Sequence, residues 1–163
     1  MGKTKKKKSL EIIVLSAEDA SKHVPKKPAL AIRIFGSKST GRGRDSYPNF
    51  PKRLYQKVLE YTFDDVDLTS CNEYAKRLYA IDYVLFNEDL ARKIITEFRQ
   101  SYKPVSSVLV HCQAGISRSP AVAHALNDIF KLKCKFPEFP NLNEYVYRTM
   151  LKDAREMGYK IKI

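Results

Sequence analysis

The sequence predicts a single α/β domain with a central, mostly parallel sheet flanked by helices. Its 163 residues suffice for one domain with a hydrophobic core and are too few for two domains of usual size. Hydrophobic residues make up 44% of the chain, which argues against a disordered protein. Short apolar runs alternate with segments of helical periodicity, the order typical of parallel strands joined by crossover helices.

The predicted strands are runs of apolar residues at 11–15, 29–35, 54–63 and 105–110. The predicted helices begin at polar or proline capping positions and repeat their apolar residues at helical spacing. They cover Ser16 to before Pro25, 88–101, a segment beginning at Ser119–Pro120, and about 142–157. Residues 36–53 are polar, basic and rich in glycine and proline, so we expect a loop there. Residues 64–86 fit either a helix or irregular structure.

The chain carries 30 Lys and Arg residues against 18 Asp and Glu, a formal net charge of +12. Five lysines lie within residues 1–8, and residues 22–53 form a second basic region. A basic surface concentrates anionic partners such as phosphoproteins or nucleic acid. We interpret residues 1–9 as a disordered basic tail and residues 10–163 as the folded domain. The tail specifies no partner by itself, and nucleic-acid binding through it is an alternative.

Cysteine usage indicates the compartment. The three cysteines are an odd number without metal-ligand spacing, which predicts neither a disulfide scaffold nor a metal site and favours the reducing cytoplasm. No apolar run approaches the roughly 18–20 residues that span a bilayer. A signal peptide is not expected, because Glu11 interrupts the apolar patch after the lysines.

The most informative segment is residues 111–119, His-Cys-Gln-Ala-Gly-Ile-Ser-Arg-Ser, which joins a predicted strand to a predicted helix. A loop in that position directs backbone N–H groups at one point beside a helix N-terminus, which is a ready anion site. Cys112 and Arg118, five residues apart, would reach the same bound anion. The positive field favours thiolate over thiol, and the arginine fork suits two phosphate oxygens. Gly115 is expected to supply a backbone angle that other residues avoid.

This segment resembles the signature loop of the cysteine-based protein tyrosine and dual-specificity phosphatases, which is a cysteine, five residues, an arginine and a serine or threonine. The preceding histidine and the central glycine also match. The resemblance is strong over 87–131, looser over 10–65 and weak elsewhere. It implies the compact, dual-specificity-like fold for the domain, with the loop at the carboxyl end of a central strand. It implies no cofactor and no metal, because Arg118 and the loop amides supply the positive field.

The resemblance also implies roles for the loop residues. Cys112 would attack phosphorus and form a phosphocysteine intermediate. Ser119 would donate a hydrogen bond to the sulfur, and His111 would orient the loop without acting as a base. The phosphate oxygens would be bound by Arg118 and by backbone amides of the substrate-binding segment, which comprises Gln113, Ala114, Gly115, Ile116, Ser117 and Arg118.

A general acid is expected upstream of the cysteine, by the same resemblance. Residues 61–66, Tyr-Thr-Phe-Asp-Asp-Val, match that acid loop, and Asp65 is the preferred candidate. Asp64 and Asp67 remain alternatives, and paired acids also cap turns. Asp65 lies 47 positions before Cys112, farther than in compact members of the family, so residues 68–86 would be an insertion.

The predicted activity is hydrolysis of a phosphate monoester on a phosphorylated protein or peptide, either phosphotyrosine alone or phosphotyrosine with phosphoserine and phosphothreonine. Inositol lipids are disfavoured, because the positions between Cys112 and Arg118 are uncharged. An RNA 5′-phosphatase of the same superfamily is an alternative suggested by the basic charge, and a non-catalytic phosphate-binding module is another. Residues 36–43 lack the Gly-Lys-Ser/Thr of a nucleotide-binding loop. We expect this basic loop either to be solvated or to attract phosphorylated substrates.

Overall fold

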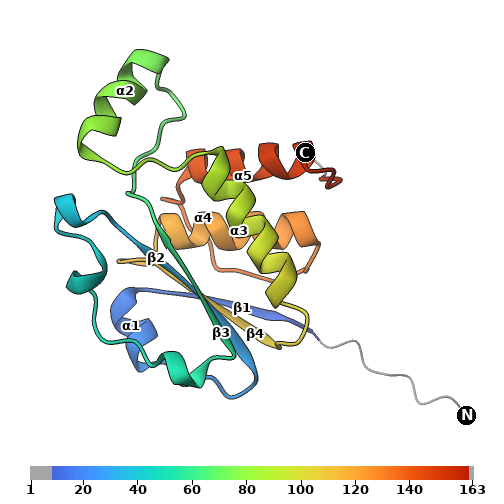
Figure 1. Ribbon diagram of the computed structural model, residues 1–163. Coiled ribbons are helices and arrows are strands. Elements are labelled where there is room, and N and C mark those ends of the chain that lie inside the picture. Colours follow the sequence, from blue (N-terminus) through green and yellow to red (C-terminus); the bar gives the residue numbers. More distant parts are fainter. Residues whose placement is uncertain (1–8, 162–163) are drawn as a thin grey trace, which may run out of the picture.

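The computed structural model describes residues 9–161, so all but the last residue of the predicted basic tail lies outside the described residues. A four-stranded sheet forms the centre of the domain, with strand order β1-β4-β2-β3 and parallel pairing throughout (Figure 1). This confirms the predicted single α/β domain with a parallel sheet. The strands are β1 (Glu11–Leu15), β2 (Ala29–Phe35), β3 (Lys57–Thr62) and β4 (Ser107–His111).

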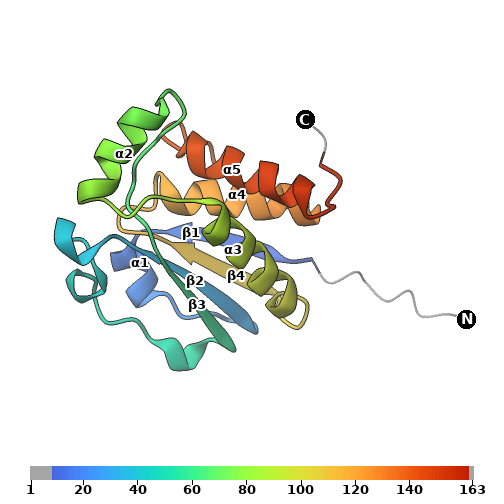
Figure 2. The same ribbon diagram turned by 45° about the horizontal axis from the view of Figure 1, so that its top comes forward.

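The helices cover both faces of the sheet. One face packs against a short helix and the other against two longer ones, on which a third long helix lies, while a further helix projects beyond the sheet (Figures 1 and 2). The helices are α1 (Ala17–Lys22), α2 (Glu73–Asp82), α3 (Glu88–Ser101), α4 (Arg118–Phe130) and α5 (Glu144–Glu156). Four begin at a side chain that accepts a backbone N–H, which satisfies a donor that the first turn leaves unpaired. These caps are Ser16, Asn72, Asn87 and Asn143.

The central strand β2 is buried along its whole length and alternates its side chains between two cores. Leu30, Ile32 and Ile34 join the larger core beneath α3, α4 and α5. Ala29 and Ala31 join the smaller core beneath α1. Small residues on the second face let the short helix approach the sheet closely. Full burial of each Leu or Ile stabilises the fold by about 1.5–3 kcal/mol.

Strand direction places three loops at one edge of the sheet. In parallel strands the carboxyl ends meet at the same edge, where ligands bind in open α/β sheets. Residues 111–119 follow β4, residues 63–67 follow β3, and the basic loop 36–53 follows β2. The register pairs Arg33 with His111 and Phe35 with Thr62, so these three loops begin side by side.

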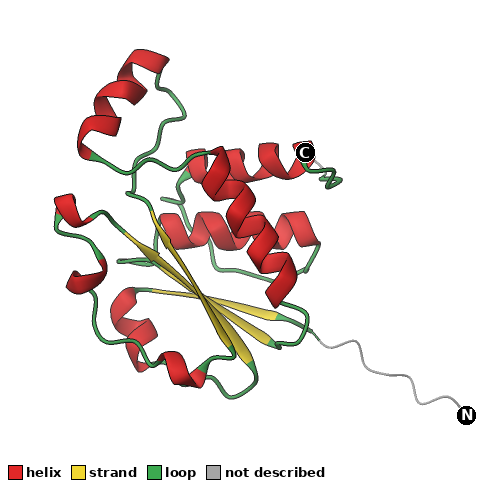
Figure 3. Ribbon diagram, in the orientation of Figure 1, coloured by secondary structure: helices red, strands yellow, loops and turns green. Residues whose placement is uncertain are grey.

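The element boundaries differ from the predictions only at their ends. β3 begins at Lys57, because residues 52–54 form a tight turn before it, and β4 runs from Ser107 to His111. Helix α4 already begins at Arg118, before the predicted start. The ambiguous stretch 64–86 contains α2 between irregular segments, and the basic loop 36–53 holds three single-turn 3₁₀ helices (Figure 3).

Within residues 9–161, none of the helices combines the length and the apolar character that a membrane crossing requires.

Candidate active site

Residues 111–119, here called the cysteine loop, fold around the sulfur of Cys112. The backbone N–H of Gly115 donates to Sγ across 3.2 Å, and the Ser119 hydroxyl lies 3.1 Å from the same atom. Cys112 and Ser119 are buried, although loop residues between them are exposed. The expected contact between Cys112 and Ser119 therefore exists, and either atom can be its donor.

Gly115 has the left-handed backbone that the sequence led us to expect, with φ +74°. The loop also packs tightly against the end of β1 here. A Cβ at Gly115 would lie 2.7 Å from backbone atoms of Leu15 and Ser16. Only glycine combines this angle with this close approach, and the angle turns the Gly115 amide toward the sulfur.

His111 is a buried, neutral support for the loop. The Arg33 Nε–H donates to His111 Nε2 across 3.0 Å, and because that arginine nitrogen can only donate, Nε2 must accept. The ring proton therefore resides on Nδ1, which donates to the Cys112 carbonyl across 3.1 Å. Burial, helped by the Arg33 charge and opposed by the carbonyl contact, lowers the pKa of His111 to about 4. This agrees with a role in orienting the loop and not with a base.

Arg33 is itself fixed by its surroundings. Its guanidinium pairs with Glu60 across 3.1 Å and lies over the rings of Phe35 and Phe50. Glu60 also pairs with two exposed cations of the basic loop, Arg44 and Lys52. Burial acts to raise the pKa of Glu60, but these cations outweigh it and hold the pKa below its ordinary value. The carboxylate stays ionised and keeps Arg33 aimed at His111.

Arg118 connects the cysteine loop to the strand that carries the acids. Its Nη1 donates to the Phe63 carbonyl across 2.9 Å, and the residue is buried. Phe63 directly follows β3 and precedes Asp64 and Asp65. The guanidinium is therefore held beside residues 63–67, here called the acid loop.

The three candidate acids occupy different environments. Asp64 is buried and accepts the backbone N–H groups of Ser37 at 2.8 Å and Val84 at 2.7 Å. Burial acts to raise the pKa of Asp64, but these hydrogen bonds outweigh it and hold the pKa below its ordinary value. Asp67 caps a local turn at Thr69. Both carboxylates accept backbone N–H groups.

Asp65 is the acid that contacts the cysteine loop. Its Oδ1 accepts the hydroxyl of Ser117 across 2.7 Å and the side-chain amide of Asn143 across 2.9 Å. Asn143 is buried, and its Oδ1 caps α5 by accepting the Val146 N–H, while its backbone N–H donates to the Ser117 carbonyl. One residue thus joins the acid loop and α5 through its side chain and the cysteine loop through its backbone.

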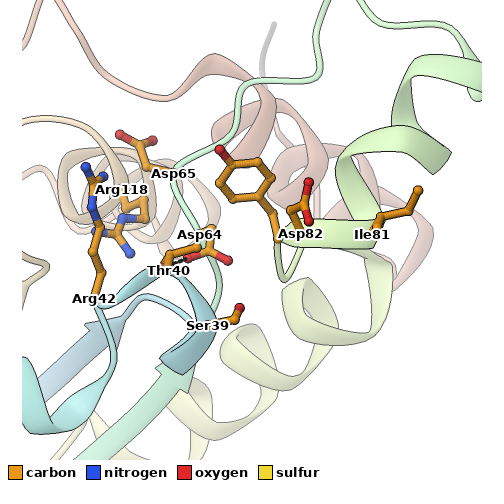
Figure 4. A pocket seen from close by; sticks show the side chains of 9 residues that line it. Ser39, Thr40, Arg42, Asp64, Asp65, Ile81, Asp82 and Arg118 are labelled. Atoms are coloured by element: carbon orange, nitrogen blue, oxygen red, sulfur yellow. Dashed lines mark hydrogen bonds between the residues drawn. The ribbon is translucent and has the colours of Figure 1, made fainter.

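A cavity of about 520 Å³ lies beside these groups. Figure 4 shows Arg42, Arg118 and Asp65 gathered at one end of it, with Ile81 and Asp82 at the other. Its remaining lining residues are Ser39, Thr40, Asp64 and Tyr83. The cavity is lined by two guanidinium groups, Arg42 and Arg118, and by three carboxylates, Asp64, Asp65 and Asp82. Guanidinium groups suit an anionic ester, and a carboxyl group beside them suits a leaving group that needs a proton.

Several supporting residues were not anticipated from the sequence. Arg33 and Asn143 lie far from the motif in the chain, and neither carries a local signal beyond a strand position and a helix cap. Tyr47 donates to the Ile34 carbonyl across 2.9 Å and its ring lies 6.0 Å from that of His111. Burial raises the pKa of Tyr47, while the nearby Arg118 charge acts in the opposite direction.

The other cysteines and acids do not join this site. The three cysteines, all within the described residues, are free, and only Cys112 lies in the cysteine loop. Carboxylates of Glu88, Asp153 and Glu156 come within 4.8 Å of one another between α3 and α5. Arg92 pairs with two of them, Asp153 and Glu156, so ion pairs account for this cluster.

Comparisons with known proteins give a distant match. No protein-family model matches the chain, and no curated protein sequence matches it. Among solved structures, the chain is similar to the crystal structure of Tk-PTP in the active form, with 12% sequence identity and a TM-score of 0.45. The match covers 94% of this chain and 84% of that chain.

Proposed function

We propose that this chain is a cysteine-dependent phosphatase that hydrolyses phosphate monoesters on tyrosine, or on tyrosine and serine or threonine, of phosphorylated proteins. The observation that carries the proposal is the buried Cys112 sulfur, which accepts the Gly115 N–H and lies 3.1 Å from the Ser119 hydroxyl, in a loop that also holds the buried Arg118. The signature-like sequence of that loop supports the same chemistry. Residues 10–163 are the proposed phosphatase domain, and it acts in the cytoplasm.

In the first step, the Cys112 thiolate attacks phosphorus in line with the leaving oxygen. The S–P bond forms as the P–O bond breaks, and Asp65 gives its proton to the departing oxygen. Arg118 and the backbone N–H groups of residues 113–118 bind the equatorial oxygens, where negative charge is concentrated in the transition state.

In the second step, water attacks the phosphocysteine and Asp65, now ionised, accepts its proton. The S–P bond breaks, inorganic phosphate leaves and the thiolate is regenerated. The Ser119 hydroxyl, 3.1 Å from the sulfur, stabilises the departing thiolate. Every catalytic group in these two steps is therefore a residue of this protein.

A phosphate-release panel tests the proposal. We expect turnover of a phosphotyrosine peptide, with or without a phosphoserine peptide, and none of inositol lipids. Cys112→Ser should lower the rate by about 10⁵-fold or more, because a catalytic nucleophile is lost. Preferred turnover of triphosphorylated RNA would identify the RNA 5′-phosphatase. No turnover, combined with protection of Cys112 by inorganic phosphate against alkylation, would identify a binding module.

A further inference from the structure

Exposed apolar side chains concentrate next to the candidate active site. Six of the eight large hydrophobic residues that are exposed in residues 9–161 lie within 74–84. They are Tyr74, Leu78, Tyr79, Ile81, Tyr83 and Val84. None of the residues of α2, all within the described part of the chain, is buried. Clustered exposed apolar residues mark binding surfaces more often than scattered ones do.

This surface is anchored to the acid loop. Asp64 and Val84 exchange two hydrogen bonds, from Val84 N to Asp64 Oδ2 and from Asp64 N to the Val84 carbonyl, each 2.7 Å long. Asp65, the proposed acid, is the next residue. The end of α2 is therefore held at a fixed place beside the chemistry, although the helix projects from the domain (Figure 2).

Two depressions meet at the end of α2. One is the cavity that Arg118 and Asp65 line, and the other is a shallow hollow of about 420 Å³ on α2. The hollow is lined by Ala75, Leu78, Tyr79, Asp82 and Tyr83. Asp82 and Tyr83 line both, so the two adjoin at these residues. A peptide whose phosphorylated residue occupies the cavity would place a neighbouring side chain over the hollow.

The chemistry of the hollow selects its occupant. Among its described lining residues Asp82 alone is charged, so a second phosphate is not favoured there. The charges of α2 balance, with Glu73 and Asp82 against Lys76 and Arg77, and offer no basic track for a nucleic acid or an anionic membrane. The side chains of Leu78 and Tyr79 offer apolar surface against which an apolar side chain of the substrate would be buried.

We infer that the α2 hollow is a specificity subsite that binds an apolar side chain near the phosphorylated residue of a peptide substrate. This inference rests on the proposed phosphatase activity. Covering an apolar side chain there releases water from both surfaces and tightens binding of the peptide. A small aryl phosphate does not reach the hollow, so its turnover is independent of α2.

Peptide kinetics test the subsite. The probes are phosphotyrosine peptides without apolar side chains other than a single leucine, moved through each position on either side of the phosphotyrosine. The reference peptide has no leucine. We expect one register to raise kcat/KM by about tenfold over the reference, as partial burial of a leucine predicts. Equal values for every peptide would overturn the inference.

Two variants test whether the leucine preference arises at the α2 hollow. The double substitution Leu78→Ser with Tyr79→Ser should remove the leucine preference and leave aryl phosphate turnover unchanged. The matched control is Tyr74→Ser, which changes an exposed residue of the same helix that lines neither depression and should retain the preference. A preference that survives the double substitution overturns the subsite. The subsite is also overturned if a single-stranded oligonucleotide inhibits turnover by the wild type but no longer inhibits the double variant. Absence of aryl phosphate turnover in the wild type would instead refute the proposed phosphatase itself.

Discussion

The cysteine loop and helix α2 approach the same cavity but are built in opposite ways. The sulfur, the hydroxyl and the guanidinium of the cysteine loop are buried, and each has a hydrogen-bond partner. Residues of α2, within the described chain, are all partly or fully exposed. The segment is held to the domain by the Val84–Asp64 hydrogen bonds just past the end of the helix and by Lys76 over the ring of Tyr145. The two regions therefore differ in how strongly the fold fixes them.

This difference matches the demands on the two regions. Chemistry needs atoms held within a fraction of an ångström, which only packed and hydrogen-bonded side chains achieve. Recognition of varied side chains tolerates a surface that is only partly covered. A change in the cysteine loop or its supports should therefore affect turnover or folding strongly, whereas a change on α2 should affect neither folding nor turnover of a small aryl phosphate. The four predictions below test this contrast.

The largest effect is expected for the proposed acid. Asp65→Asn keeps the shape of the side chain but removes the proton that the leaving oxygen needs. We expect turnover of an aryl phosphate with a poor leaving group to fall about 10²–10⁴-fold, and turnover of one with a good leaving group to change little. Steady-state kinetics on both esters measure this. An unchanged rate with the poor leaving group would refute the assignment, and Asp67→Asn serves as the control.

The next effect concerns the pH dependence of stability. The pKa of His111 is about 4 in the fold, against 6.5 for the ordinary side chain. Between these values the unfolded chain binds a proton that the folded chain does not. The free energy of unfolding therefore falls as the pH drops from about 6.5 to about 4, by about 3 kcal/mol from this group.

Urea unfolding over that pH range measures this loss. In His111→Gln the amide oxygen still accepts from Arg33 but cannot titrate, so the variant should lose less stability than the wild type as the pH falls. Carboxylates titrate in both proteins, so their contribution to the pH dependence of stability cancels when the wild type and the variant are compared. Equal slopes for the two proteins would show that His111 is not buried in its neutral form.

A smaller effect is expected at Asn143. Asn143→Ala removes the cap of α5 and the side-chain hydrogen bonds to Asp65 Oδ1 and to the Val66 carbonyl in the acid loop. This should lower the free energy of unfolding by about 1–2 kcal/mol. Asn87→Ala removes the equivalent cap of α3, which does not contact the acid loop, and is the matched control. Only Asn143→Ala should also slow turnover of the poor-leaving-group ester. Equal kinetics for the two variants would show that Asn143 does not position Asp65.

The same contrast explains what could be predicted from the sequence. Strand and helix positions were evident because burial imposes periodicity, as along β2, and because Asn87 and Ser16 cap their helices locally. The cysteine loop was evident because its chemistry lies in nine consecutive residues. Its supports were not, since Arg33 reaches His111 across 78 positions and Asn143 reaches Asp65 across the same separation. Such contacts depend on strand register and helix packing, which no local pattern reveals.

Helix α2 remained ambiguous for a different reason. Its apolar residues are not confined to one buried face, so the signal that identifies a packed helix is weak. The binding function that we propose for α2 could not be predicted from the sequence either, because the sequence alone does not distinguish an exposed leucine or tyrosine from a buried one. That the α2 hollow adjoins the cavity at Asp82 and Tyr83 is visible only in three dimensions.

The smallest effect is expected on α2 itself. Ile81 is 76% exposed, so Ile81→Ala should change the free energy of unfolding by less than about 0.5 kcal/mol. The identical substitution at Ile94, which is 0% exposed in α3, should lower it by about 2–5 kcal/mol, because it leaves a cavity in the core. Urea unfolding of both variants gives the comparison. A loss at Ile81 as large as that at Ile94 would mean that α2 packs into the domain in solution, and the surface proposed to receive an apolar side chain would then be closed.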